Sequence, residues 1–179
     1  SPGRSNSCAR RSRGTPGPKT KTPRFTDRLA VAADAGFIVA LHAAPHARRF
    51  VHAPSEDEVR RRIEETDLEQ RIILDRDTPV GMWALHVRDE WLAEFVRIVA
   101  IAPGRGIGTY ALRRMIARAF DDLSAHRAYL EVVAENPARR LYEREGFVLE
   151  GTFRDGYREA PGVYRDLCAY GMLAAHRAP

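Results

Sequence analysis

Three glycines, spaced two residues apart, interrupt the chain between an apolar run and a helical pattern. They are Gly104, Gly106 and Gly108, within the stretch IVAIAPGRGIGTYALRRM. The apolar residues 92–102 predict a strand, and from 107 to 123 the apolar residues recur at helical spacing, which predicts an amphipathic helix. A strand, a tight turn and a helix in this order are typical of α/β folds. This unit constrains the fold more than any other part of the chain.

The glycine turn also predicts a phosphate-binding site. Glycine removes the Cβ atoms where a ligand must approach the backbone, and the free N–H groups at a helix N-terminus attract phosphate. The dinucleotide pattern G-x-G-x-x-G fails because Thr109 stands where its third glycine belongs, and the P-loop pattern fails because no lysine lies there. A tight turn without any ligand is the alternative interpretation of the same residues.

Other stretches have the periodicity of strands or helices. Ser55, with Glu58 three residues later, predicts a capped helix over 55–65. Asn136 before Pro137 predicts the N-cap of a short helix that ends at Gly146. The remaining patterns predict a strand at 24–33, a broken helix at 33–50, two strands within 70–87, a strand at 127–135, and two final strands at 147–155 and 163–173. This order predicts a single α/β sandwich domain over residues 24–179.

The positive charge of the chain is concentrated before this domain. Residues 1–26 carry seven Arg or Lys and no acid, so the net charge of +5 minus +7 leaves −2 for residues 27–179. A slightly negative domain argues against nucleic acid as a partner. We expect residues 1–23, which are rich in Ser, Pro, Gly and Arg, to form a disordered basic arm or leader; a targeting sequence is the alternative.

Cysteine content and hydropathy narrow the class of protein further. Cys8 and Cys168 give neither a disulfide framework nor a metal-ligand spacing, so we expect a cytoplasmic protein without a metal. No apolar run is long enough to span a bilayer, which predicts that no membrane is among its partners.

Two separated motifs resemble those of the GNAT superfamily of N-acetyltransferases. They are AEFVRIVAIAPGRGIGTYALRRMIARAF and, further on, ENPARRLYEREGFVLEG. The resemblance covers residues 24–174 and is closest to the branch of ribosomal-protein N-terminal and spermidine-type acetyltransferases. It implies a mixed, mostly antiparallel sheet of about seven strands flanked by helices, with the fourth and fifth strands splayed apart. It also implies acetyl-CoA as co-substrate and direct attack by a primary amine in a ternary complex, and it is compatible with a homodimer.

The resemblance assigns roles to individual residues. Glu94 matches the general base on the fourth strand, and Tyr142 matches the general acid beside the sulfur of CoA. Asn136 matches a CoA contact, although it stands six residues before Tyr142 where relatives have seven. The cofactor-binding residues implied by the loop and by the edge of the fourth strand are Val99, Ala100, Ile101, Gly104, Arg105, Gly106, Ile107, Gly108 and Thr109.

The acceptor amine is the least defined part of this hypothesis. The resemblance allows a protein N-terminus, a polyamine or a small amine such as an antibiotic. It places the acceptor between the first helices and the last hairpin, and the candidate residues there are His42, His46, Arg49, Phe50, Trp83, Trp91, Tyr157 and Tyr164. A catalytically silent acyl-CoA-binding module is the alternative function, and the presence of both Glu94 and Tyr142 argues against it.

Overall fold

The computed structural model describes residues 24–177, and the expected arm at 1–23 lies outside the described residues. Within the described part, one seven-stranded sheet has the order β1-β2-β3-β4-β5-β7-β6. Its strands are β1 (Phe25–Leu29), β2 (Leu68–Asp75), β3 (Thr78–Asp89), β4 (Leu92–Ala100), β5 (Arg127–Val133), β6 (Val148–Ala160) and β7 (Val163–Leu173). The α-helices are α1 (Ala35–Ala43), α2 (Glu56–Ile63), α3 (Ile107–Ala117) and α4 (Arg139–Arg144).

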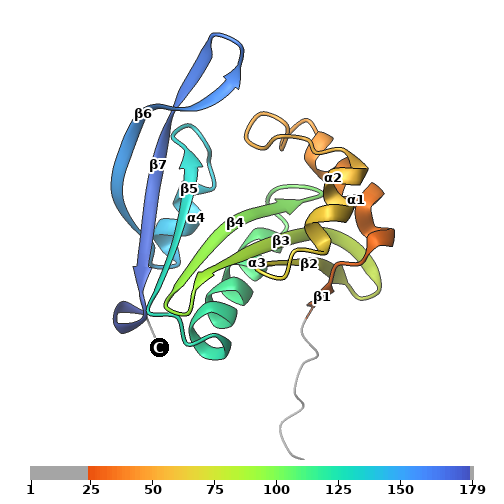
Figure 1. The fold of residues 1–179 in the computed structure, drawn as a ribbon, viewed down its shortest axis with the longest axis horizontal. Coiled ribbons are helices and arrows are strands. Elements are labelled where there is room, and N and C mark those ends of the chain that lie inside the picture. Colours follow the sequence, from red (N-terminus) through yellow and green to blue (C-terminus); the bar gives the residue numbers. More distant parts are fainter. Residues whose placement is uncertain (1–23, 178–179) are drawn as a thin grey trace, which may run out of the picture.

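The sheet divides between β4 and β5. These two strands are the parallel pair of the sheet, and all other neighbours are antiparallel. β4 and β5 pair only over Leu92–Glu94 and Arg127–Tyr129, and beyond Glu94 they diverge (Figure 1). The predicted mixed sheet with splayed fourth and fifth strands is therefore confirmed.

Two apolar clusters hold helices on opposite faces of the sheet. One cluster joins α3 to the sheet and includes Leu112 and Met115 of the helix, both fully buried. The other joins α1 and α2 to the sheet through Ile38 and Val59. Ser55 caps α2 as predicted, because its hydroxyl accepts a hydrogen bond from the Glu58 amide at 3.2 Å. The split edge of β4 thus lies between two helical layers.

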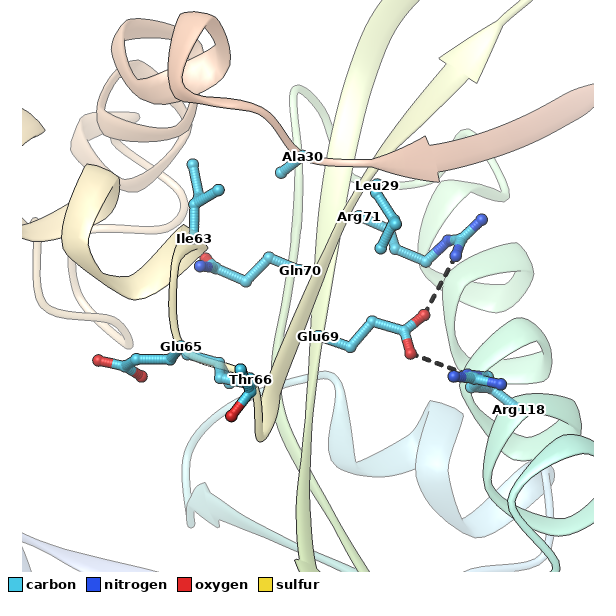
Figure 2. A pocket seen from close by; sticks show the side chains of 10 residues that line it. Leu29, Ala30, Ile63, Glu65, Thr66, Glu69, Gln70, Arg71 and Arg118 are labelled. Atoms are coloured by element: carbon cyan, nitrogen blue, oxygen red, sulfur yellow. Dashed lines mark hydrogen bonds and ion pairs between the residues drawn. The ribbon is translucent and has the colours of Figure 1, made fainter.

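Ionic contacts fix α3 to the first two strands. The side chain of Asp27 on β1 is 2% exposed and accepts hydrogen bonds from the Tyr110 hydroxyl (2.7 Å) and Arg114 Nε (2.9 Å) on α3. Figure 2 shows Glu69 on β2 paired with Arg71 at 3.1 Å and with Arg118, just beyond α3, at 2.8 Å. A buried carboxylate is costly unless it is paired, so these contacts restrict where α3 can sit. They consequently fix the position of its N-terminus.

β4 contains a bulge at Val96. Phe95 pairs with Leu85 of β3, but the next residue of β3, Ala84, pairs with Arg97. Val96 is therefore the extra residue, which changes the face toward which the following residues point. Ala84 belongs to the cluster under α1 and α2, so Arg97 lies on that face as well.

Several predicted boundaries differ from the structure, and the strand expected at 147–155 runs on to Ala160 as β6. The strand expected over 24–33 ends at Leu29, because the Asp34 carboxylate accepts a hydrogen bond from the Val31 amide (2.8 Å) and pairs with Arg28 (2.7 Å), which holds a turn there. The amphipathic helix ends its α-helical part at Ala117 and continues as a wider π-helical turn over Arg118–Asp122.

Candidate active site

A large cavity lies at the C-terminal end of β4. Its volume is about 1070 Å³, and residues from the glycine turn, the start of α3, the edge of β4, the α4 region and the segment after α1 line it. The cavity brings together ten of the twelve residues implied above: Val99, Ala100, Gly104, Arg105, Gly106, Ile107, Gly108, Thr109, Asn136 and Tyr142. Ile101 and Glu94 do not line it.

The glycine turn presents bare backbone to this cavity. Gly104 and Gly106 have φ angles of +76° and +81°, in the left-handed region that favours glycine. A Cβ atom added to either glycine would meet no heavy atom within 4 Å. Gly106 is also the N-cap of α3, so the first N–H groups of the helix face the same space. This geometry can bind an anionic group on backbone donors.

Arginine side chains surround the same turn. Arg105, Arg144 and Arg49 all line the cavity, and Arg144 Nη2 donates a hydrogen bond to the Thr109 hydroxyl at 3.1 Å. Guanidinium groups bind phosphate oxygens through paired hydrogen bonds. Backbone donors, helix dipole and arginines therefore suit a pyrophosphate, which carries several negative oxygens.

The edge of β4 supplies the opposite wall. Ile98, Val99 and Ala100 line the cavity where β4 has left β5. His46 Nε2 donates to the Ala100 carbonyl at 2.8 Å, which attaches the segment after α1 to the end of the strand. The Ile101 amide already donates to the Val80 carbonyl at 2.9 Å, so this residue belongs to the ladder with β3.

Tyr142 points its ring into the floor of the cavity from α4. The ring is half-buried and packs against Phe147 and Tyr170, with both centroid distances at 6.3 Å. Burial raises the pKa of the Tyr142 hydroxyl to about 12, so the group keeps its proton at neutral pH. Among the described residues, no hydrogen-bond partner engages this hydroxyl. It is therefore free to donate to a ligand.

Asn136 acts as a local cap. Its Oδ1 accepts a hydrogen bond from the Ala138 amide at 2.9 Å, and α4 begins only at Arg139. Pro137 therefore lies in the turn before the helix, not at the predicted first helical position. Asn136 also lines the cavity, so its side-chain amide remains close to the space for a ligand.

Glu94 lies on the α1–α2 face of β4, outside the residues that line the cavity. Its ladder partner on β3 is His86, which stands two residues from Ala84. The pairs Glu94–His86 and Arg97–Ala84 therefore lie on the same face of the sheet. Arg88 Nε donates to the Glu94 carboxylate at 2.5 Å, and His86 Nδ1 is 3.7 Å from it. The Tyr129 hydroxyl and the Glu94 carboxylate raise the pKa of Arg88. Glu94 is therefore an ion-paired carboxylate whose charge is shared with Arg88.

The candidate acceptor residues are distributed over the molecule. His46, Arg49 and Phe50 line the cavity. Trp83 is 1% exposed and belongs to the core under α3, so it cannot touch an acceptor. The others lie outside the cavity: His42 on α1, Trp91 at the β3–β4 turn, and Tyr157 and Tyr164 on the last hairpin.

The sequence did not single out Arg97. Its Nη1 donates to His42 Nε2 at 3.0 Å, and His42 Nδ1 in turn donates to the Ile38 carbonyl at 2.7 Å. Because the carbonyl can only accept, we assign the proton of the neutral ring to Nδ1. Burial lowers the pKa of His42 to about 4, so the ring is neutral at pH 7. An isolated arginine in a strand pattern gives no signal that could have predicted this pair.

A smaller cavity is a less suitable site. It measures about 320 Å³ and lies against β2, where Glu69 is already paired with Arg71 and Arg118 (Figure 2). In residues 24–177, no group of three or more His, Cys, Asp or Glu side chains is placed to hold a metal ion. None of the helices described is both long and apolar enough to cross a membrane.

Comparisons with known proteins agree with this geometry. Residues 24–148 match the acetyltransferase (GNAT) domain family. YdaF of Bacillus subtilis (strain 168), named as a ribosomal N-acetyltransferase, is 34% identical over 103 residues, which are 52% of this chain and 52% of that protein. The match thus spans about half the length of this curated relative.

Solved structures extend the likeness to most of the chain. A chimera of the spermidine N-acetyltransferase SpeG from Vibrio cholerae and hSSAT has a TM-score of 0.76 at 26% identity, covering 86% of this chain and 97% of that one. The Vibrio cholerae spermidine N-acetyltransferase in complex with CoA and spermine has a TM-score of 0.75, again at 26% identity, with the same coverage of both chains.

Proposed function

Because the chain belongs to the acetyltransferase (GNAT) domain family, we propose that it transfers an acetyl group from acetyl-CoA to a primary amine by direct attack in a ternary complex. One observation carries the proposal. A single cavity contains the glycine turn, the free edge of β4 and the unpartnered hydroxyl of Tyr142. These are a site for a phosphate group, a backbone edge for an extended arm and a proton donor. YdaF and the CoA-bound SpeG structure support acetyl-CoA as donor.

In this proposal the turn binds the pyrophosphate of acetyl-CoA. The amides at the start of α3 donate to its oxygens, and Arg105 and Arg144 supply positive charge. Val99 and Ala100 offer backbone groups of β4 to the pantetheine arm. Acetyl-CoA supplies an activated thioester when bound. Tyr142 protonates the departing thiolate, which its raised pKa permits because the hydroxyl is protonated at neutral pH.

Glu94 is the proposed base for the acceptor. An ammonium with an ordinary pKa of about 10.4 must lose a proton before it can attack. The Glu94 carboxylate lies on the same face of β4 as Val99, which lines the cavity, and we assign it the removal of that proton through water. Its hydrogen bond from Arg88 fixes the position of the carboxylate on the strand.

The acceptor belongs to one of three classes: a protein N-terminus, a polyamine or another small amine. The name of YdaF supports the first and those of the SpeG structures support the second. A silent acyl-CoA-binding module would bind the donor without turnover. The catalytic groups Tyr142 and Glu94 favour an enzyme.

The test combines donor binding with an acceptor screen. We expect acetyl-CoA to raise the melting temperature, since a ligand that binds only the folded state stabilises it. The screen then measures release of free CoA thiol with N-terminal peptides, polyamines, aminoglycosides and amino-acid analogues. A rise in melting temperature without turnover of any acceptor would favour the catalytically silent acyl-CoA-binding module. No shift at saturating acetyl-CoA would reject the proposal altogether.

A further inference from the structure

The carboxylates of Glu94 and Glu58, on the acceptor side of β4, are already paired, and this argues against a polyamine as the acceptor. A polyamine carries further ammonium groups beside the one that reacts, and these need carboxylates that are not already neutralised. On this face, Glu94 is paired with Arg88 and Glu58 is paired with Arg62 at 2.6 Å. Each of these carboxylates is already neutralised by an arginine, so neither is available to pair with a second ammonium.

Arg97 is the exception to this pairing. Within residues 24–177, no carboxylate oxygen lies within 4 Å of its guanidinium, and its hydrogen bond goes to the neutral ring of His42. A guanidinium has five N–H donors and stays charged in proteins. One of these donors is engaged in the hydrogen bond to His42. The other guanidinium nitrogens are not among the buried polar atoms that lack a hydrogen-bond partner. The remaining donors therefore face accessible space.

The surroundings of Arg97 identify that space. Burial lowers the pKa of Arg97, and the positive charge of Arg62 on α2 adds to this effect, whereas Glu58 on α2 and Tyr157 on β6 oppose it. The hydrogen bond to His42 of α1 and the pairing with Ala84 place Arg97 on the face of β4 that α1 and α2 cover. Figure 1 shows the tip of the last hairpin and the connection between α1 and α2 rising on the same side of the divided sheet. This is the region between helices and hairpin where an acceptor would reach Glu94.

The strand register gives the spacing between Glu94 and Arg97 along the sheet. The ladder partners of Glu94 and Arg97, His86 and Ala84, are two residues apart because of the bulge at Val96. Two residues of a strand span about 7 Å. An amine near Glu94 and an anionic group at Arg97 therefore fit within one small molecule or within the first two residues of a peptide.

We propose that the acceptor is a primary amine with a carboxylate or similar anionic group a few bonds away, and that Arg97 binds this anionic group. The inference rests on the proposed acetyl transfer and names its substrate class. Arg97 acts as a specificity residue here: its fork of donors matches a carboxylate, and a neutral amide in the same place would lose the charge-assisted bonds. Two kinds of molecule carry an amine and an anionic group at this spacing: a free amino-acid-like amine, and a peptide with an acidic second residue.

Matched acceptors distinguish these sources. The first pair is 4-aminobutyrate and 4-aminobutanamide, the second is the peptides Ser-Glu-Ala-Ala and Ser-Gln-Ala-Ala, and spermidine represents polyamines. We expect kcat/KM to favour the acid over its amide by about 10- to 100-fold in at least one pair, as hydrogen bonds to charged groups allow. Spermidine should be a poorer acceptor than the preferred acid.

Variants assign the preference to Arg97. Arg97→Gln should reduce the acid-to-amide ratio to about one, and Arg97→Lys should keep part of it because the charge remains. Arg61→Gln, which removes an exposed charge from α2, is the matched control and should keep the wild-type ratio. Acetyl-CoA affinity should be the same in all four proteins, because Arg97 does not line the donor cavity.

The outcomes separate this inference from the proposed function. If acetyl-CoA does not bind, the proposed function fails. If it binds and spermidine is the best acceptor, or if Arg97→Gln and Arg97→Lys both keep the wild-type ratio, only the role of Arg97 is overturned. Calorimetric binding of the same acid and amide pairs to the protein saturated with CoA gives the comparison without turnover, and equal affinities in that assay would also overturn it.

Discussion

Replacement of Gly106 by alanine tests whether the glycine turn binds the donor. The residue is in the left-handed region at φ +81° and borders the cavity, where an added Cβ atom would meet nothing within 4 Å. An L-residue in this conformation costs about 1–2 kcal/mol of folding free energy. For a domain of this size, that cost lowers the melting temperature by roughly 2–8 °C. The protein should still fold, because no neighbour has to move.

The effect on binding should exceed this strain. The new methyl group would occupy the space beside the amides at the start of α3, so the bound phosphate would lose at least one charge-assisted hydrogen bond. Such a bond contributes about 1.5–3 kcal/mol, which corresponds to about a 10- to 100-fold rise in the Kd for acetyl-CoA. Isothermal titration calorimetry measures this Kd, and urea denaturation measures the folding cost.

Gly162 provides a matched control. It lies in the turn between β6 and β7 with φ +78°, and an added Cβ atom there also meets nothing within 4 Å. Gly162→Ala should lose similar stability, while its Kd for acetyl-CoA stays at the wild-type value. Equal Kd values for Gly106→Ala and wild type, in a folded protein, would refute the reasoning about the turn.

Three further predictions concern the proposed chemistry and the attachment of α3. Tyr142→Phe should lower kcat by about 10²- to 10⁴-fold with little change in acetyl-CoA affinity, because the ring still packs and only the proton donor is lost; wild-type turnover would end this assignment. Glu94→Gln should lower kcat at neutral pH and recover as the acceptor ammonium deprotonates near pH 10, whereas a pH–rate profile parallel to wild type would contradict a role as base. Asp27→Asn should cost about 3 kcal/mol of unfolding free energy at pH 7, since it breaks a buried ion pair. Burial raises the pKa of Asp27, but the hydrogen bonds from Tyr110 and Arg114, together with the charge and hydrogen bond of Arg71, outweigh it and lower the pKa from its ordinary value of 3.8. Its stabilising effect is therefore present above that value and disappears as the pH falls through the lower folded-state pKa, so the deficit of Asp27→Asn in urea denaturation should shrink below pH 4; a deficit independent of pH would contradict this.

Local patterns predicted most of the elements, because they depend on residues close in the sequence. The α3 periodicity, the Ser55 cap and the glycine turn all follow from neighbours within a few positions. The end of β1 was predicted less well. It depends on the pairing of Asp34 with Arg28, and the apolar residues 29–33 carry no sign of that contact.

The site was predictable in part for the same reason. The donor residues sit in contiguous motifs, and ten of them line one cavity. The acceptor side depends on contacts between distant segments: Arg97 meets His42 only because α1 folds over β4, and only the bulge at Val96 places Arg97 on that face. The burial of Trp83 under α3 also depends on contacts between distant segments, so the sequence did not predict it. Because it is buried, Trp83 is no longer a candidate acceptor residue.

The division of the sheet has a consequence for backbone hydrogen exchange. β4 pairs with β5 only over Leu92–Glu94, so the amides of its later residues that point toward β5 have no strand partner there. Such amides should exchange their hydrogens with solvent quickly, while those that donate to β3 are protected by the ladder. A ligand that extends along the free edge would act as a temporary strand and slow the exchange. Deuterium uptake along β4 therefore reports, residue by residue, how far a bound molecule closes the gap between the two halves of the sheet.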